Sequence, residues 1–276
     1  MIIDLAARCA NMITVVTPVY EPNLGLFEKT VNSMFYQTVP DWRWVIVLDG
    51  ARTIKKVKSA SYYDKLCEDN RITIVEEQKH VGVSKARNLA LDLINSGFVA
   101  FLDADNWFHS EAVNIFHQTA KQTTDQFEQG ERLIFTYKQC VIIRPEHYEN
   151  TPHYAVNFRD GALVTPYDLF FDNKTDLGQI LHTVGDTRFD EEMTRLVDWD
   201  YLIQLFHSGY QQIAFTDIVT SFYDSLYRKN RVSCSESFPI NRNYILNKWK
   251  DSIVEMDKKL REQEEEQCEH SLILKG

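Results

Sequence analysis

The feature that most constrains this chain is a run of five apolar residues, 98–102, that leads straight into Asp103, Ala104 and Asp105. An apolar run of this length predicts a strand that is buried on both faces, as in a parallel sheet. Parallel sheets present their ligands at the carboxyl ends of the strands, so we expect the two acids at the rim of a cleft. Because side chains of an extended strand alternate with a period of two, both carboxylates should point the same way.

Two carboxylates that converge on one point repel each other unless a cation lies between them. Such a site of hard oxygen ligands suits Mg²⁺ or Mn²⁺, which usually also hold substrate phosphates. The alternative is structural, with Asp103 or Asp105 capping a helix that starts near Ser110. The pair of acids alone does not decide between a metal site and a helix cap.

The first 105 residues alternate between strand and helix patterns. We expect strands at 12–17, 42–48, 72–75 and 98–102, and helices at 24–36, in part of 51–66, and at 83–94. This alternation predicts a Rossmann-like, mostly parallel sheet flanked by helices, with a nucleotide-binding half over about 12–105. The chain has neither a Gly-x-Gly-x-x-Gly nor a Walker-type Gly-Lys-Ser/Thr motif, which argues against a dinucleotide enzyme or a P-loop NTPase.

The second half of the chain is less regular. We expect a helix at 110–123, strands at 133–137, 139–143 and 212–216, a long polar loop at 144–160 and a helix at 200–208. These segments predict an acceptor half over about 106–240, completing an α/β domain over 1–240. From residue 241 to 276 the chain is charged and helical in pattern, which predicts a C-terminal tail exposed to solvent.

Composition limits the partners and the compartment. The net charge of −10 argues against nucleic acid as a partner. No apolar run reaches the roughly 18 residues of a membrane-spanning helix, although peripheral association with a membrane stays open. The five cysteines are scattered and indicate no disulfide framework, so we expect a cytoplasmic protein.

Seven short motifs stand in an order that resembles glycosyltransferase family 2, whose members have the GT-A fold. The motifs are Ile13–Thr17 followed by Pro18-Val19-Tyr20-Glu21, then Ser33–Thr38, Val45–Gly50, Gly82–Asn88, Asp103–Asn106, Phe189–Glu192 and Val197–Tyr201. They cover roughly residues 12–235, and the tail lies outside the resemblance. Leu48, Asn106 and Val197 replace acids of the family pattern.

The resemblance implies a metal-dependent, inverting transfer of a sugar from a nucleotide sugar to a hydroxyl of a glycan or another acceptor. It implies that Asp105 binds Mn²⁺ or Mg²⁺ at the nucleotide diphosphate and that Asp103 lies near the ribose and the metal. Arg87 either faces the pyrophosphate or forms a salt bridge on a helix face. Asp198 is implied to be the general base that takes the proton of the acceptor hydroxyl.

The resemblance also implies where the nucleotide base binds. Asp49 would accept a hydrogen bond from the base, which favours a UDP-sugar, unless Asp49 only forms an Asp-Gly turn. Pro18 and Tyr20 would flank the base in the turn that also holds Glu21, unless Tyr20 is a core residue.

Other interpretations of the acids stay open. Asp198 and Asp200 also suit the N-cap region of a helix. His182 and His207 are weak candidates for a third metal ligand, because a lone histidine is more often structural.

Two other functions also stay open. A nucleotidyltransferase would join a nucleotide fold to paired acids, but it normally carries a glycine-rich basic loop after the first strand. A catalytically weak or inactive binding module would keep the fold and lose turnover. The three replaced acids keep that module possible, whereas the intact Asp103, Asp105 and Asp198 argue against it.

Overall fold

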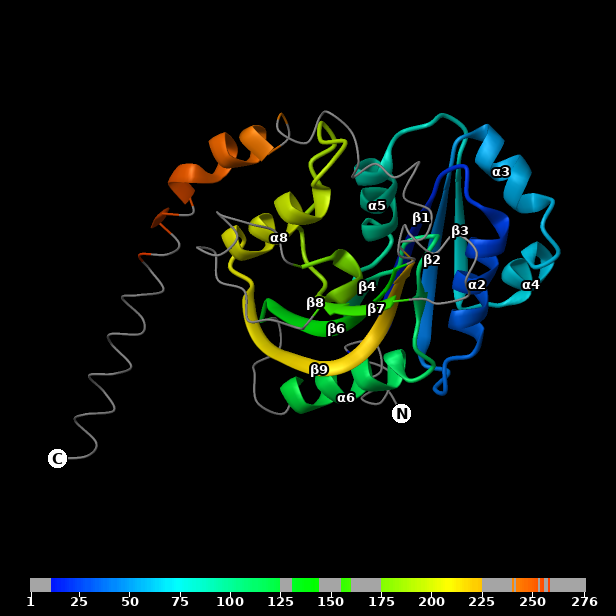
Figure 1. Cartoon of the computed structure of the whole chain (residues 1–276), viewed down its shortest axis with the longest axis horizontal. Coiled ribbons are helices and arrows are strands. Elements are labelled where there is room, and N and C mark those ends of the chain that lie inside the picture. The colour runs from blue at the N-terminus through cyan, green and yellow to red at the C-terminus, as the bar shows by residue number, and fades with distance from the viewer. Residues whose placement is uncertain are drawn as a thin grey trace.

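The computed structural model describes residues 11–124, 131–143, 155–159 and 175–224 and, near the C-terminus, 240, 242–252, 254–255 and 258. The strands are β1 (Ile13–Val19), β2 (Trp42–Asp49), β3 (Ile72–Glu77), β4 (Phe98–Phe101), β5 (Trp107–Phe108), β6 (Leu133–Ile143), β7 (Ala155–Arg159), β8 (Ile180–Thr183) and β9 (Gln211–Asp224). The helices are α2 (Leu24–Phe35), α3 (Ala51–Lys58), α4 (Tyr63–Glu68), α5 (Val83–Leu91), α6 (Ala112–Thr124), the 3₁₀ helix η1 (Leu177–Gln179) and α8 (Val197–His207). In the described residues the strands form one sheet in the order β3-β2-β1-β4-β8-β6-β9-β5, with β7 paired to β6 (Figure 1).

The first half of the sheet is parallel, as the sequence predicted. Strand β1 lies between β2 and β4, and β2 pairs with β3, all in parallel register. Val16 of β1 pairs with Val45 on one side and Phe101 on the other. The carboxyl ends of these four strands therefore meet along one edge, where the chain places Tyr20, Asp49 and the turn at Asp103.

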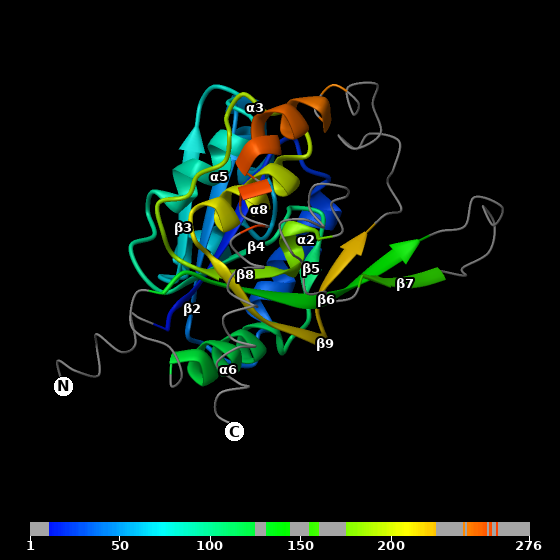
Figure 2. The same cartoon turned by 90° about the vertical axis from the view of Figure 1, so that its left-hand side faces the viewer.

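The second half of the sheet is mixed. Strand β8 is antiparallel to both β4 and β6, whereas β6 and β9 are parallel over most of their length. Figure 2 shows these long strands curving past the end of the parallel half. The two strands expected at 133–137 and 139–143 are one strand, because register shifts against β9 on both sides of Lys138 absorb the polar interruption. Part of the segment predicted as a loop is strand β7, and residues 144–154 of that prediction lie outside the described residues.

Alternate residues of each strand pack into two cores on opposite faces of the sheet. One core joins Val15, Trp44 and Ile46 to the helices α2, α3, α4 and α6, whereas the other joins Val16, Val47 and Phe101 to α5 and α8. Figure 1 shows α2, α3 and α4 on one flank of the parallel strands and α5 and α8 on the other. This burial on both faces explains why the strands read as continuous apolar runs.

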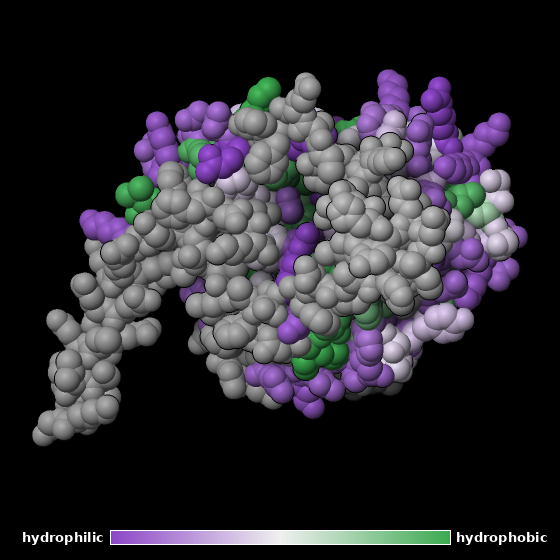
Figure 3. Space-filling view, viewed as in Figure 1, coloured by the Kyte–Doolittle hydropathy of each residue, from purple (hydrophilic) through white to green (hydrophobic). Residues whose placement is uncertain are grey.

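The outward face of α3, one of the helices that cover the first core, is strongly polar. Its outward side chains Arg52, Lys55, Lys56 and Lys58 are exposed, and its inward residues Thr53, Ile54 and Val57 are buried. Figure 3 shows hydrophilic side chains over this part of the molecule, at the upper right of the view. Within the described part of the chain, no helix is both long and apolar enough to span a membrane.

The described part of the C-terminal segment forms a helix at 242–252 that packs against α8. Ile245 is fully buried there, and Trp249 is nearly so. This part of the tail is therefore docked rather than solvated on all sides, whereas the acidic run at 262–266 lies outside the described residues.

Candidate functional site

The two acids after β4 lie in a tight turn, not in an extended strand. Strand β4 ends at Phe101, and the backbone N–H of Asn106 donates to the carbonyl of Asp103 at 3.0 Å. This is the geometry of a β-turn, so the expectation of strand-like parallel side chains at Asp103 and Asp105 was wrong. The reason is that Asp and Asn favour turns over strands once the apolar run has ended.

Neither acid of this turn is the N-cap of helix α6. That helix begins at Ala112, so the N-cap position belongs to residue 111. The side chain of Asn106 has a structural role, since its Oδ1 accepts from the backbone N–H of Asp224 at 3.2 Å and so ties the turn to β9. Asn106, which stands where the family pattern has an acid, thus helps to fix the position of the turn.

Arg87 reaches this turn from helix α5. Its Nη2 donates to Asp103 Oδ1 at 2.8 Å, so the salt bridge of Arg87 is with this turn and not on a helix face. The side chain is only 5% exposed, and among the described residues nothing accepts from its Nε or Nη1. Burying a guanidinium costs free energy when some of its N–H groups lack an acceptor, unless an anion accepts hydrogen bonds from them. The site therefore offers N–H groups of the kind that bind phosphate.

The neighbouring Asn88 fixes the orientation of α5. Its Nδ2 donates to the carbonyl of Phe189 at 2.9 Å, and its Oδ1 accepts from the Phe189 backbone N–H at 2.8 Å. The Phe189 ring lies 5.2 Å from the guanidinium of Arg87. The Ala-Arg-Asn motif therefore joins the parallel half of the sheet to the segment that precedes α8.

Asp198 lies in the first turn of α8, which begins after Leu196 in a left-handed conformation with φ 54°. Leu196 is the N-cap, so neither Asp198 nor Asp200 occupies that position. The pKa of Asp198 is raised to about 6, chiefly by burial and then by the nearby Asp176, although hydrogen bonds from backbone N–H groups and the charge of Arg87 oppose the rise. A carboxylate with a pKa near neutrality is suited to general base catalysis.

Asp176 belongs to a polar cluster that the sequence analysis missed. It accepts from Gln139 and from Arg159, each at 3.3 Å, and it forms a capping box with Gln179 at the start of η1. The spacing Asp-x-x-Gln is a capping signal that is visible in the sequence. The approach of Arg159 and Gln139 was not visible, because it depends on the pairing of β6 with β7.

Asp200 has a structural role. Its carboxylate is buried and accepts from Trp249 Nε1 and from Gln204 Nε2, both at 2.6 Å, and from Lys248 Nζ at 3.0 Å. Lys248 also contacts Asp190 at 2.6 Å. These bonds hold the C-terminal helix against α8.

The two histidines named as weak metal candidates have other contacts. The ring nitrogens of His182 bind the carbonyl of Thr183 at 2.7 Å and the hydroxyl of Tyr201 at 3.2 Å, and burial lowers its pKa to about 4. His207 packs on Trp249 with ring centroids 5.2 Å apart. Among the residues that the structure describes, no group of three or more His, Cys, Asp or Glu side chains could hold a metal ion by itself.

The expected base site contains a residue that the sequence analysis did not name. Asp49 ends β2 and is 2% exposed, and its oxygens accept from the backbone N–H groups of Val81 and Gly82 and contact His80 Nδ1 at 2.8 Å. Tyr20 is 53% exposed, so it is not a core residue, and its ring stacks on that of His80.

Two further predicted residues lie at the end of β1. Pro18 is the sixth residue of that strand and pairs with Val47. The backbone N–H of Glu21 donates to Thr53 Oγ1 at 2.9 Å, and the Glu21 carboxylate lies 3.8 Å from Arg52. Glu21 therefore contacts α3, with a positive φ of 38° that a turn at this point requires.

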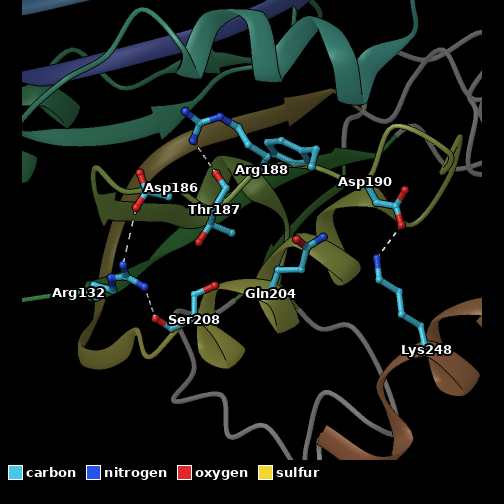
Figure 4. Close-up of a pocket in the computed structure, with 9 residues that line it drawn as sticks. Arg132, Asp186, Thr187, Arg188, Asp190, Gln204, Ser208 and Lys248 are labelled. Carbon is cyan, nitrogen blue, oxygen red and sulfur yellow. Dashed lines mark hydrogen bonds and ion pairs between the residues drawn. The ribbon is translucent and has the colours of Figure 1, made fainter.

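A cavity of about 510 Å³ lies away from these residues, between the 185–190 segment, the C-terminal half of α8 and Lys248 (Figure 4). Each cation that lines it already has a protein partner: Arg132 binds Ser208, Arg188 binds Asp92, and Lys248 binds Asp190. None of the predicted site residues lines this cavity. The candidate site is therefore the sheet edge at Asp49, Asp103 and Asp198.

The comparisons with known proteins identify the family of this chain. Residues 14–180 match the family described as Glycosyl transferase family 2. The chain is 23% identical over 216 residues to the amylovoran biosynthesis glycosyltransferase AmsB of Erwinia amylovora, covering 76% of this chain and 69% of the relative. It is 30% identical over 116 residues to the succinoglycan biosynthesis protein ExoW of Rhizobium meliloti, covering 41% of this chain and 35% of that protein.

Solved structures show the same fold. A crystal structure of S. aureus TarS 1–349 in complex with UDP-GlcNAc matches with a TM-score of 0.59 at 16% identity, covering 85% of this chain and 64% of that chain. The mannosyltransferase PcManGT from Pyrobaculum calidifontis, in complex with GDP-Man and Mn²⁺, matches with a TM-score of 0.50 at 20% identity, covering 79% and 57%. The α/β GT-A fold expected from the motifs is confirmed, and the chain belongs to glycosyl transferase family 2.

Proposed function

We propose that this chain is a metal-dependent, inverting glycosyltransferase that moves a sugar from a nucleoside diphosphate sugar to a hydroxyl group. The observation that carries the proposal is the position of Asp198. Its pKa is raised to about 6, and it interacts electrostatically with Arg87, which itself binds Asp103 in the turn that holds Asp105. A base and an anion site thus lie together at the carboxyl edge of the sheet.

Asp198 takes the proton of the acceptor hydroxyl while the hydroxyl oxygen forms a bond to the anomeric carbon. The bond from that carbon to the phosphate oxygen breaks on the opposite face, and its electron pair leaves with the nucleoside diphosphate. A single displacement of this kind inverts the anomeric configuration. The unused N–H groups of Arg87 donate to the departing diphosphate.

Asp105, with Asp103 beside it, would hold the divalent cation. Two carboxylates suit Mg²⁺ or Mn²⁺, because these ions are commonly bound by one or two carboxylates, with substrate phosphates and water as the other ligands. When bound, the cation neutralises charge on the diphosphate. The structure of the mannosyltransferase with a similar fold is a complex with GDP-Man and Mn²⁺, which supports this assignment.

We place the donor in the half at about 12–105 and the acceptor in the half at about 106–240. The TarS complex with UDP-GlcNAc supports a UDP-sugar as donor. The polar cluster of Asp176, Arg159 and Gln139 lies beside Asp198, where it can bind acceptor hydroxyls, as a glycan requires.

The test is a panel of nucleotide sugars incubated with the purified protein in Mn²⁺ and, separately, in excess EDTA. We expect release of a nucleoside diphosphate from at least one donor in Mn²⁺ and none in EDTA, with an inverted anomeric carbon by NMR. Release of pyrophosphate from a nucleoside triphosphate and a sugar phosphate would show a nucleotidyltransferase instead. Donor binding without any turnover would show a binding module.

A further inference from the structure

We infer that Lys248, on the C-terminal helix at 242–252, is a positioning residue that holds Asp198 in place for the transfer reaction. The inference rests on the proposed function, in which Asp198 is the general base. The helix lies beyond residues 14–180, which match the family, so its role does not follow from that match. Figure 4 shows Lys248 extending from this helix toward Asp190, which precedes α8.

Lys248 joins two carboxylates that lie on either side of Asp198 in the sequence. Its Nζ lies 2.6 Å from Asp190 Oδ2 and 3.0 Å from Asp200 Oδ1. The side chain of Asp190 is 15% exposed and that of Asp200 is 1% exposed, so water and salt screen these ion pairs only weakly. One ammonium group therefore ties together the two ends of the segment 190–200, which carries Asp198.

The charges of this link stabilise each other. Burial alone lowers the pKa of Lys248, but its hydrogen bonds to Asp190 and Asp200 and the charges of both carboxylates raise it overall. Burial alone raises the pKa of Asp190, but hydrogen bonds from Lys248 and from the backbone N–H of Glu192 lower it overall. The ammonium and the Asp190 carboxylate are therefore both charged at neutral pH, which gives a charge-assisted hydrogen bond.

The start of α8 depends on contacts of this kind. Its N-cap, Leu196, has a left-handed φ of 54°, a conformation that persists in a non-glycine residue only where the surroundings impose it. A leucine side chain also has no oxygen that could accept from the first turn. The N–H of Asp200 donates to the Leu196 carbonyl at 3.1 Å, and the Asp200 carboxylate accepts from Trp249 Nε1 at 2.6 Å. The C-terminal helix therefore helps to fix the turn that carries Asp198.

The segment before α8 is held by the same helix and by α5. Asp190 Oδ1 accepts from the Glu192 N–H at 3.0 Å, which forms a turn, and Oδ2 accepts from the Tyr244 hydroxyl at 3.1 Å as well as from Lys248. On α5, Ser84 Oγ donates to the carbonyl of residue 193 at 3.2 Å. Loss of the ammonium would leave this segment attached mainly through α5.

The donor side of the site is held by other contacts. Arg87 on α5 donates to Asp103 in the turn that also carries Asp105, and this pair does not involve the C-terminal helix. Loss of Lys248 should therefore displace Asp198 and leave the donor site in place. This separation predicts a lower kcat at unchanged donor affinity.

The test compares Lys248→Met and Lys248→Arg with the wild-type protein. Turnover is the release of nucleoside diphosphate from the nucleotide sugar that the donor panel identifies, in Mn²⁺ with water as acceptor. It is divided by the folded fraction, which circular dichroism measures during urea unfolding. Calorimetry gives the affinity for the same nucleoside diphosphate.

Lys248→Met keeps the length of the side chain and removes its charge. We expect turnover per folded molecule to fall roughly 5- to 50-fold, because small displacements of a reacting group are costly, with unchanged nucleoside diphosphate affinity. Lys248→Arg can bind both carboxylates, and the adjoining cavity of about 510 Å³ has room for the larger head group, so turnover should stay within a few-fold of wild type. Asp200→Asn perturbs the link less, because it keeps an oxygen acceptor and leaves the ion pair with Asp190 intact.

Tyr244→Phe is a milder variant whose folding is not in question, since the side chain is 41% exposed and loses only the hydroxyl that donates to Asp190. Its turnover should fall roughly two- to fivefold at unchanged affinity. Lys250→Met is the matched control, because this exposed lysine on the same helix loses the same charge. It should change neither turnover nor affinity.

A purely structural role for Lys248 predicts fewer folded molecules, each with wild-type turnover. That result for Lys248→Met and Tyr244→Phe would overturn the inference, as would a Lys248→Arg protein as slow as Lys248→Met. A loss of nucleoside diphosphate affinity in proportion to turnover would also overturn it, because the lysine would then act on the donor site. If the wild-type protein released no nucleoside diphosphate from any donor, the proposed function would fail, and the inference with it.

Discussion

Replacing Asp198 with Asn tests the catalytic assignment through two measurements, for which a purely structural role predicts different results. The substitution keeps the size of the side chain and removes its basicity. We expect transfer at saturating donor to fall by roughly 100-fold or more, the usual scale for a positioned base. Donor affinity should stay close to that of the wild-type protein.

The stability of the same variant follows from the pKa. In the folded protein burial raises the pKa of Asp198 from an ordinary value of 3.8 to about 6. The folded state therefore holds this proton over a pH range in which the unfolded chain has lost it, and the wild-type protein loses stability as pH rises from about 4 to about 6. Two pKa units correspond to about 3 kcal/mol.

Asp198→Asn removes this loss. The free energy of unfolding of the variant, relative to wild type, should increase between pH 4 and pH 6 and reach up to about 3 kcal/mol above pH 6. Urea unfolding at several pH values measures it. Asp186→Asn is the matched control, because that side chain is fully exposed, with a relative exposure of 101%, and lines only the separate cavity. A variant that is less stable at pH 7 and retains full turnover would refute the catalytic reasoning and support a purely structural role.

The remaining predictions concern the metal, the base and the C-terminal helix. Asp105→Ala should abolish the dependence of nucleotide affinity on Mn²⁺, since only one carboxylate would remain to hold the cation beside two phosphates. If calorimetry shows the same Mn²⁺-dependent affinity as in the wild-type protein, the metal assignment is wrong. Tyr20→Ala should weaken nucleotide binding by about 1–3 kcal/mol while thermal stability holds, because the ring is exposed. Asp200→Asn should lower the free energy of unfolding by about 1.5–3 kcal/mol through the weakened bonds to Trp249 and Lys248, with turnover per folded molecule within a few-fold of wild type. A stable but inactive Asp200→Asn protein would show that the base is Asp200.

The parallel half of the fold was predictable because its signals are local. Each strand is an apolar run with a helix after it, and right-handed crossovers then allow few arrangements. The mixed half was not predictable in the same way. Strands β6 and β9 pair although Leu133 and Gln211 are far apart in sequence, and the extent of β9 follows from that partner rather than from its own composition.

For the site, the sequence by itself determined which residues end the parallel strands, and these include Tyr20, Asp49 and Asp103. Only the tertiary structure decided what each side chain can reach. The contacts of Arg87 with Asp103 and of His80 with Asp49 join segments from different elements, as does the electrostatic influence of Asp176 on Asp198. Burial has the same origin, because the pKa of Asp198 rises only once the packing of the sheet and α8 removes water from it. Residue types and their order are local properties of the chain, whereas distance and solvent access exist only after the chain has folded.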